Sequence, residues 1–116
     1  MPLNSLFFWA LVALVVFVAV RTLLAARNRI SAADARAKVD AGALLLDVRT
    51  PGEFAMGAIP GAKNIPVQSL AGRLGELSKE RAIGVYCASG MRSASALSLL
   101  RRSGFEVYDL GPASRW

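Results

Sequence analysis

The chain has 116 residues, a single cysteine, no histidine and a net charge of +6. This length suffices for one compact domain but not for two. One cysteine excludes an intrachain disulfide, and the lack of histidine excludes histidine-ligated metal sites and catalysis by a histidine base. Residues 30–116 carry only a mild basic excess without interleaved aromatics, so no nucleic-acid partner is expected.

The first twenty residues have no charged side chain, and residues 6–20 read LFFWALVALVVFVAV. Twenty helical residues span about 30 Å, the thickness of the hydrocarbon core of a bilayer. We therefore expect one transmembrane helix within residues 1–26, with the membrane around residues 6–24. Basic side chains follow the span, which predicts an inner-membrane protein with its N-terminus outside and its domain in the cytoplasm. There are two alternatives to a membrane span. One is a cleavable signal peptide, which would need a basic start that this sequence lacks, and the other is a buried core helix.

After a basic connector at residues 27–29, helical and strand-like patterns alternate through residues 30–116. Helices are predicted over residues 32–40, 51–56, 68–77 and 91–103, the third being weak because two glycines interrupt it. Short apolar runs predict buried parallel strands at 43–48, 81–87 and 105–110, with a brief strand at 62–64. The pattern predicts an α/β domain with a small parallel sheet, helices on both faces, and sites at the carboxyl ends of strands.

Cys87 ends the second of these strands, and a helix is predicted to begin at Met91. A strand–loop–helix connection directs backbone N–H groups and the positive end of the helix dipole at the sulfur, which favours a thiolate. Gly90 permits a tight loop, and Arg92 adds a positive charge. Such a thiolate suits transfer of sulfane sulfur, because the departing anion needs no proton. The alternative is an inert, buried cysteine.

Three segments resemble the motifs of single-domain rhodaneses, and the resemblance covers residues 30–116. They are LLDVRTPGEFAMGAIPGAKNIP at residues 45–66, CASGMRS at residues 87–93 and DLGPASRW at residues 109–116. The resemblance implies a rhodanese-like fold and a sulfurtransferase that carries a persulfide on Cys87, without cofactor or metal. It implies a small anionic sulfur donor such as thiosulfate, and a thiol, cyanide or an acceptor protein as the recipient.

The same resemblance assigns roles to residues around Cys87. The loop that would bind the persulfide comprises Ala88, Ser89, Gly90, Met91 and Arg92. The scaffold beside it comprises Asp47, Arg49 and Glu53, with an Arg49–Glu53 ion pair expected, and Trp116 is expected in the core. Related phosphatases have a loop one residue longer, which would require arginine where this chain has Ser93. Phosphatase activity is therefore disfavoured.

Two positions depart from the family pattern. Ala58 stands where the family usually has histidine, and Pro112 follows Gly111 where a second glycine is commoner. A second hypothesis therefore remains open: a membrane-tethered rhodanese-like binding or sulfur-carrier module with little or no turnover. A third, a structural partner for another membrane protein, is disfavoured because the span lacks polar residues and small-residue motifs.

Overall fold

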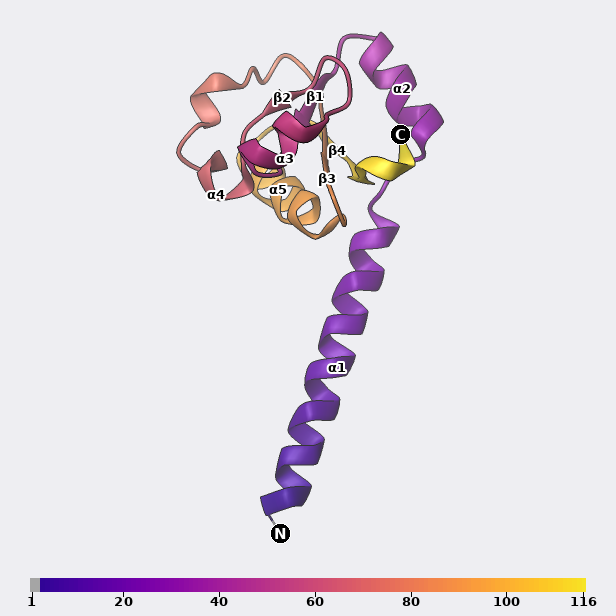
Figure 1. Ribbon diagram of the computed structural model, residues 1–116, viewed down its shortest axis with the longest axis vertical. Helices are drawn as coiled ribbons and strands as arrows, with labels where there is room; N and C mark the ends of the chain where they lie inside the picture. The colour runs from indigo at the N-terminus through magenta and orange to yellow at the C-terminus, as the bar shows by residue number, and fades with distance from the viewer. Residues whose placement is uncertain (1–2) are drawn as a thin grey trace.

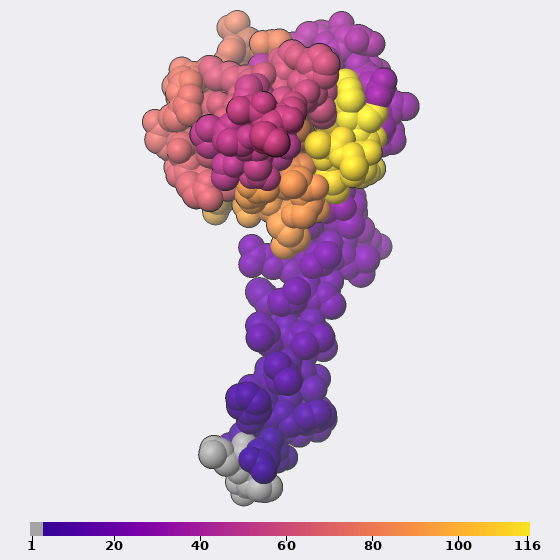
Figure 2. Space-filling model, in the orientation of Figure 1, coloured from indigo at the N-terminus to yellow at the C-terminus, as the bar shows by residue number. Residues whose placement is uncertain are grey.

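The apolar N-terminal segment forms one long helix, α1 (Leu3–Arg27), in the computed structural model, which describes residues 3–116 (Figure 1). Most of its large apolar side chains are exposed, and the space-filling view shows it as a stalk below the domain (Figure 2). Its length and composition are sufficient to cross a bilayer. Residues 1–2, which the sequence places in the predicted span, lie outside the described residues.

The domain is built on a four-stranded parallel sheet, as the alternating pattern predicts. Its strands are β1 (Leu44–Asp47), β2 (Lys63–Asn64), β3 (Ile83–Cys87) and β4 (Val107–Pro112), in the order β2-β1-β3-β4. The last strand begins two residues later than expected, because the Phe105 N–H donates to the Leu100 carbonyl and closes the preceding helix. β3 lies in the interior of the sheet, with β1 and β4 on either side.

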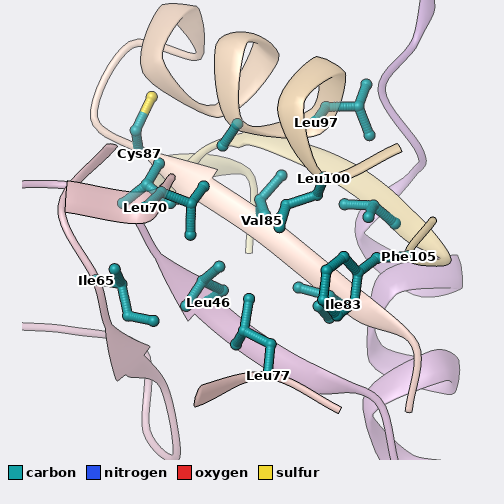
Figure 3. Packing of buried hydrophobic residues seen from close by; sticks show 13 residues of the cluster. Leu46, Ile65, Leu70, Leu77, Ile83, Val85, Cys87, Leu97, Leu100 and Phe105 are labelled. Atoms are coloured by element: carbon teal, nitrogen blue, oxygen red, sulfur yellow. The ribbon is translucent and has the colours of Figure 1, made fainter. Parts of the chain in front are cut away.

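Helices cover both faces of the sheet, which confirms the predicted layering. The short helix α4 (Val67–Leu70) and the longer α5 (Met91–Arg102) lie on one face and bury a cluster that includes Val85 and Leu100 (Figure 3). The helix α2 (Ala32–Asp40) and the 3-10 turn η2 (Ala113–Arg115) cover the other face. Successive strand residues point to opposite faces, so Val85 and Tyr86 belong to different clusters.

Two helices begin at capping residues. The Asp34 N–H donates to the Ser31 hydroxyl at the start of α2, as expected. At α3 (Pro51–Met56), the Thr50 hydroxyl accepts the Glu53 N–H while the Glu53 carboxylate accepts the Thr50 N–H. This reciprocal pair fixes the Glu53 carboxylate at the first turn of α3.

The predicted helix over residues 68–77 is wrong. The segment contains only α4 and a 3-10 turn, η1 (Leu74–Glu76). The Gly72 N–H donates to the Ser69 carbonyl, so the chain tightens and turns at the first of the two glycines. The Arg73 guanidinium then binds the Glu76 carboxylate across η1.

Candidate active site

Cys87 is the last residue of β3, and its side chain is fully buried at the margin of the core cluster (Figure 3). Pairing of β3 with two parallel neighbours brings their carboxyl ends to the same edge of the sheet. Asp47 ends β1 opposite Tyr86, and Pro112 ends β4 opposite Cys87. The thiol therefore occupies the strand-end position at which open α/β sheets place their sites.

Two backbone amides hold the sulfur. The Gly90 N–H donates to Cys87 Sγ at 3.0 Å, and the Ser93 N–H donates to the same atom at 3.3 Å. Gly90 adopts a φ of 96°, which lets the chain turn from β3 into α5 within three residues. The sulfur thus lies at the N-terminal end of a twelve-residue helix, where N–H groups and the helix dipole favour negative charge.

Ser93 is a site residue that the sequence-based assignment omits. Its side chain is fully buried, and its hydroxyl donates to the Gly90 carbonyl at 3.1 Å. Ser93 therefore contacts both the sulfur and the glycine that turns the loop. The sequence does carry a signal for it: a hydroxyl three residues after a loop glycine, inside the first turn of a helix, can bond back to that loop.

Among the loop residues, Ala88, Ser89 and Met91 are exposed, while Gly90 is buried. Arg92 is half-buried and forms a bidentate ion pair with Glu53, with N–O distances of 2.6 and 3.0 Å. The Arg92 guanidinium, together with the Thr50 amide, lowers the pKa of the Glu53 carboxyl to about 2. The pair is therefore charged at neutral pH and joins α3 to the first turn of α5.

The expected Arg49–Glu53 ion pair is wrong, because each residue has another partner. The Arg49 guanidinium binds the fully buried Asp47 carboxylate at 2.7 and 3.0 Å and donates to the Gly57 carbonyl at 2.7 Å. The Asp47 carboxylate raises the pKa of Arg49. Arg49 and Asp47, only two residues apart, thus form a closed pair at the end of β1, and Glu53 is left to Arg92.

Two further residues that the sequence singles out, Ala58 and Trp116, lie outside the cysteine loop. Ala58 is exposed, and the next residue, Ile59, donates its N–H to the Tyr86 hydroxyl at 3.2 Å. Trp116, which is expected in the core, is half-buried and packs against the cluster on the α2 face.

Comparison with known proteins gives the family. The profile of the rhodanese-like domain matches residues 31–111. A sulfurtransferase of Allochromatium vinosum is 42% identical over 62 residues, 53% of this chain and 58% of that protein. The thiosulfate sulfurtransferase GlpE of Stutzerimonas stutzeri is 36% identical over 84 residues, 72% of this chain and 77% of that protein. The human single-domain sulfurtransferase TSTD1 superposes with a TM-score of 0.63 at 27% identity, over 77% of this chain and 91% of that one.

This chain belongs to the family of rhodanese-like domains, and its parallel α/β sheet superposes on that of a single-domain sulfurtransferase. The matched region spans less than two thirds of the Allochromatium protein, so the family assignment concerns the domain rather than that whole protein. Sulfur transfer in general is the activity that these relatives support.

Proposed function

We propose that Cys87 accepts sulfane sulfur from a small anionic donor such as thiosulfate, carries it as a persulfide, and passes it to a thiophilic acceptor. The observation that carries this proposal is the position of Sγ, which accepts two amide N–H groups at the N-terminal end of α5. The same donors that stabilise a thiolate also stabilise an anionic persulfide.

The transfer needs no acid or base from the protein. The Cys87 thiolate attacks the outer sulfur of thiosulfate, a new S–S bond forms, and the old S–S bond breaks with its electron pair leaving on sulfite. Cys87 then bears a persulfide anion. An acceptor such as cyanide or a thiolate attacks the terminal sulfur, and the electron pair of the broken bond returns to Cys87. Neither half requires a proton to be added or removed, which suits a site without histidine.

The loop residues supply the surroundings for the added sulfur. Ala88, Ser89 and Met91 form the exposed side of the loop, so a second sulfur bonded to Sγ can extend toward their amides. Arg92 brings a guanidinium to the same turn, and its pairing with Glu53 holds it in place. In this proposal Asp47 and Arg49 fix the end of β1 without touching the substrate.

Residues 1–26 would anchor the domain in the inner membrane, with residues 30–116 in the cytoplasm. Exposed apolar side chains along α1 support this part of the proposal. A groove between α1 and α5 is lined by Arg21 and Ala25 on one side and by Met91 and Ala94 on the other. The end of the domain that carries the persulfide loop would therefore face the membrane surface.

The alternative is a tethered binding or sulfur-carrier module with little turnover. Complete burial of Cys87 favours it, because a small acceptor in solution must reach a sulfur that has no exposed surface. An acceptor protein that docks on the loop would then be required for release.

Turnover of thiosulfate and cyanide by the detergent-solubilised full chain tests the proposal. We expect sulfite and thiocyanate to form in equal amounts with the parent chain, and neither to form with Cys87→Ser. Ser78→Ala, a hydroxyl deletion remote from the loop, is the matched control and should retain the parent rate. Sulfite release in one burst, without thiocyanate, would favour the carrier; no sulfite from a folded protein would contradict both.

A further inference from the structure

Arg29 lies in the short segment that joins α1 to α2, and this segment runs beside the edge strand of the sheet. Arg29 forms a parallel bridge with Asp109 of β4, and the Ile30 N–H donates to the Asp109 carbonyl at 2.9 Å. Asp109 lies two residues before Gly111, where β4 approaches the end of the sheet that holds Cys87. The chain therefore delivers Arg29 to the persulfide loop directly from the helix proposed as the membrane anchor.

The Arg29 side chain lies against two glycines. A Cβ atom placed on Gly90 would come within 2.2 Å of Arg29 Nη2, and one on Gly111 within 2.7 Å of Arg29 Cδ and Nε. Both glycines have positive φ, 96° and 77°. Gly90 is also the residue whose N–H holds Cys87 Sγ. The guanidinium thus fills the space that the two glycines leave open, directly behind the sulfur-binding amide.

A buried acidic residue, Asp109, lies near the place where Arg29 contacts the two glycines. Asp109 is fully buried, its Oδ1 accepts the Gly111 N–H at 2.8 Å, and its Oδ2 has no hydrogen-bond partner among residues 3–116. Arg29 Nε is likewise buried without a partner in the same part of the chain. Burial raises the pKa of Asp109, and the Ser93 hydroxyl, the Gly111 amide and, after them, the Arg29 and Arg115 charges counter that rise. Arg29 and Asp109 therefore lie near each other under the loop, each with a buried polar atom that has no partner among residues 3–116, and they form no ion pair in this part of the chain.

We propose that Arg29 is a positioning residue for sulfur transfer: its guanidinium, near the Asp109 carboxylate, packs against Gly90 and so holds the Gly90 amide on the cysteine sulfur. This inference rests on the proposed sulfurtransferase function. Arg29 follows the last residue of α1 by only two positions, so the same contact links the anchor helix to the reacting loop. Unlike Arg92, Arg29 acts through the backbone of the loop rather than on the substrate.

The test compares Arg29→Gln with Arg27→Gln in the detergent-solubilised full chain. Arg27 is exposed at the end of α1 and has no hydrogen bond or ion pair among the described side chains, so Arg27→Gln removes the same charge without the contact. We expect Arg29→Gln to slow sulfur loading at saturating thiosulfate about tenfold, as misplaced groups do, without changing the apparent affinity for thiosulfate. Equal rates in the two variants, or a changed affinity with an unchanged maximal rate, would overturn the proposal.

Alkylation of Cys87 by iodoacetamide gives a readout that does not require turnover. A loosened Gly90 amide and a lost cation both make the thiolate less favourable, so alkylation of Arg29→Gln at neutral pH should be slower than in Arg27→Gln. Faster alkylation would show that Arg29 only covers the thiol, and would overturn the proposal. If the parent chain alkylates but never loads sulfur, the proposed function fails while the alkylation comparison still tests the role of Arg29.

A double-mutant cycle tests the contribution of Asp109. If Arg29 and Asp109 act as one unit, Arg29→Gln/Asp109→Asn should load sulfur no more slowly than the slower single variant. If the two substitutions slow sulfur loading by factors that multiply in the double variant, Arg29 and Asp109 act independently and the pairing is contradicted. Melting temperatures recorded in parallel separate loss of fold from loss of rate.

Discussion

Individual side chains at the site are held by two ion pairs of different character. Asp47 and Arg49 form a pair within one strand end, where the carboxylate has no exposed surface. Glu53 and Arg92 join two helices and remain about one third exposed. The first pair therefore fixes local geometry at the end of β1, whereas the second decides how α3 approaches the loop.

The Glu53–Arg92 pair should make stability depend on pH in a defined window. The pKa of Glu53 falls from 4.5 to about 2 in the folded chain, so its contribution is complete above about pH 4.5 and disappears as the pH falls toward about 2. Glu53→Gln should melt at a lower temperature than the parent at pH 7, and the difference should shrink through that window. Thermal melts of the solubilised chain measure this.

Glu76→Gln is the control for that experiment. Arg73 lowers the pKa of Glu76 to about 2 as well, but this pair lies on η1, away from the loop. Both variants should show the pH-dependent difference, while only Glu53→Gln should slow sulfur loading. A loss of loading in both would contradict a specific role for the Glu53–Arg92 pair.

Gly90→Ala should damage the loop more than a glycine replacement elsewhere. The new Cβ would require a disfavoured φ and would collide with Arg29, so we expect a cost of about 1–3 kcal/mol and slower sulfur loading. Gly75→Ala is the comparison, because a Cβ at Gly75 meets no atom within 4 Å. That variant should be neutral or slightly stabilised. Equal denaturant midpoints for the two variants would contradict the strain at Gly90.

Among the elements, α5 connects the core to the site. Its buried residues follow helical spacing along one face: Ser93, Ala96, Leu97 and Leu100. The first of these reaches the sulfur through its N–H, and the last packs under the sheet. Packing of the helix body therefore sets where its N-terminal amides lie.

Leu100→Ala tests that dependence. Leu100 is fully buried, so its truncation should cost about 2–5 kcal/mol in the free energy of unfolding. Met56→Ala, at a side chain that is 90% exposed, should change stability by less than about 0.5 kcal/mol. Denaturant titrations of both variants give the comparison. A small cost at Leu100 would mean that α5 is not anchored by this face.

Sequence patterns predict most elements of this fold because local signals and burial agree. The strand at Cys87, the helix after it and the capped helices at Ser31 and Thr50 all carry apolar runs or capping residues at their ends. The helix predicted over residues 68–77 is weak in the sequence because two glycines interrupt it, and in the structure these glycines and the Arg73–Glu76 contact favour a tight turn instead. Strand β4 begins two residues after the start of its apolar run, because the Phe105 N–H bonds back to Leu100 and closes the preceding helix.

At the site, the sequence indicates the cysteine and its loop but not the partners that hold them. Arg49 and Glu53 have suitable charge and spacing for each other, and only the end of β1 shows that Asp47 is nearer to Arg49. Arg29 is separated from Gly90 by sixty residues of chain, so no local pattern could join them. Long-range packing of this kind requires the fold.

The whole molecule is a domain on an apolar stalk, and the β3–α5 connection lies at the end of the domain nearest that stalk (Figure 1). In the proposed orientation the persulfide loop would face the membrane surface. Donors or acceptors held at that surface would then meet the loop at a raised local concentration.

Two arginines introduced at the middle of α1 test whether this helix anchors the chain in a membrane. Leu14→Arg combined with Val16→Arg should raise the free energy of insertion by roughly 5–7 kcal/mol, since each arginine costs about 2.5–3.5 kcal/mol at the centre of a span. When membranes are extracted with carbonate, this double variant should be released into the soluble fraction. Leu14→Ile combined with Val16→Leu should stay in the membrane fraction. Retention of the arginine variant would contradict a transmembrane α1.

Intact-protein mass spectrometry of the solubilised full chain shows whether Cys87 carries the sulfur during transfer. After incubation with thiosulfate and removal of the donor, we expect the added mass of one sulfur atom, located on Cys87 by peptide mapping. That mass should disappear when cyanide is added and should never form on Cys87→Ser. A folded parent chain that stays unmodified after exposure to thiosulfate or glutathione persulfide would contradict a persulfide carrier at Cys87.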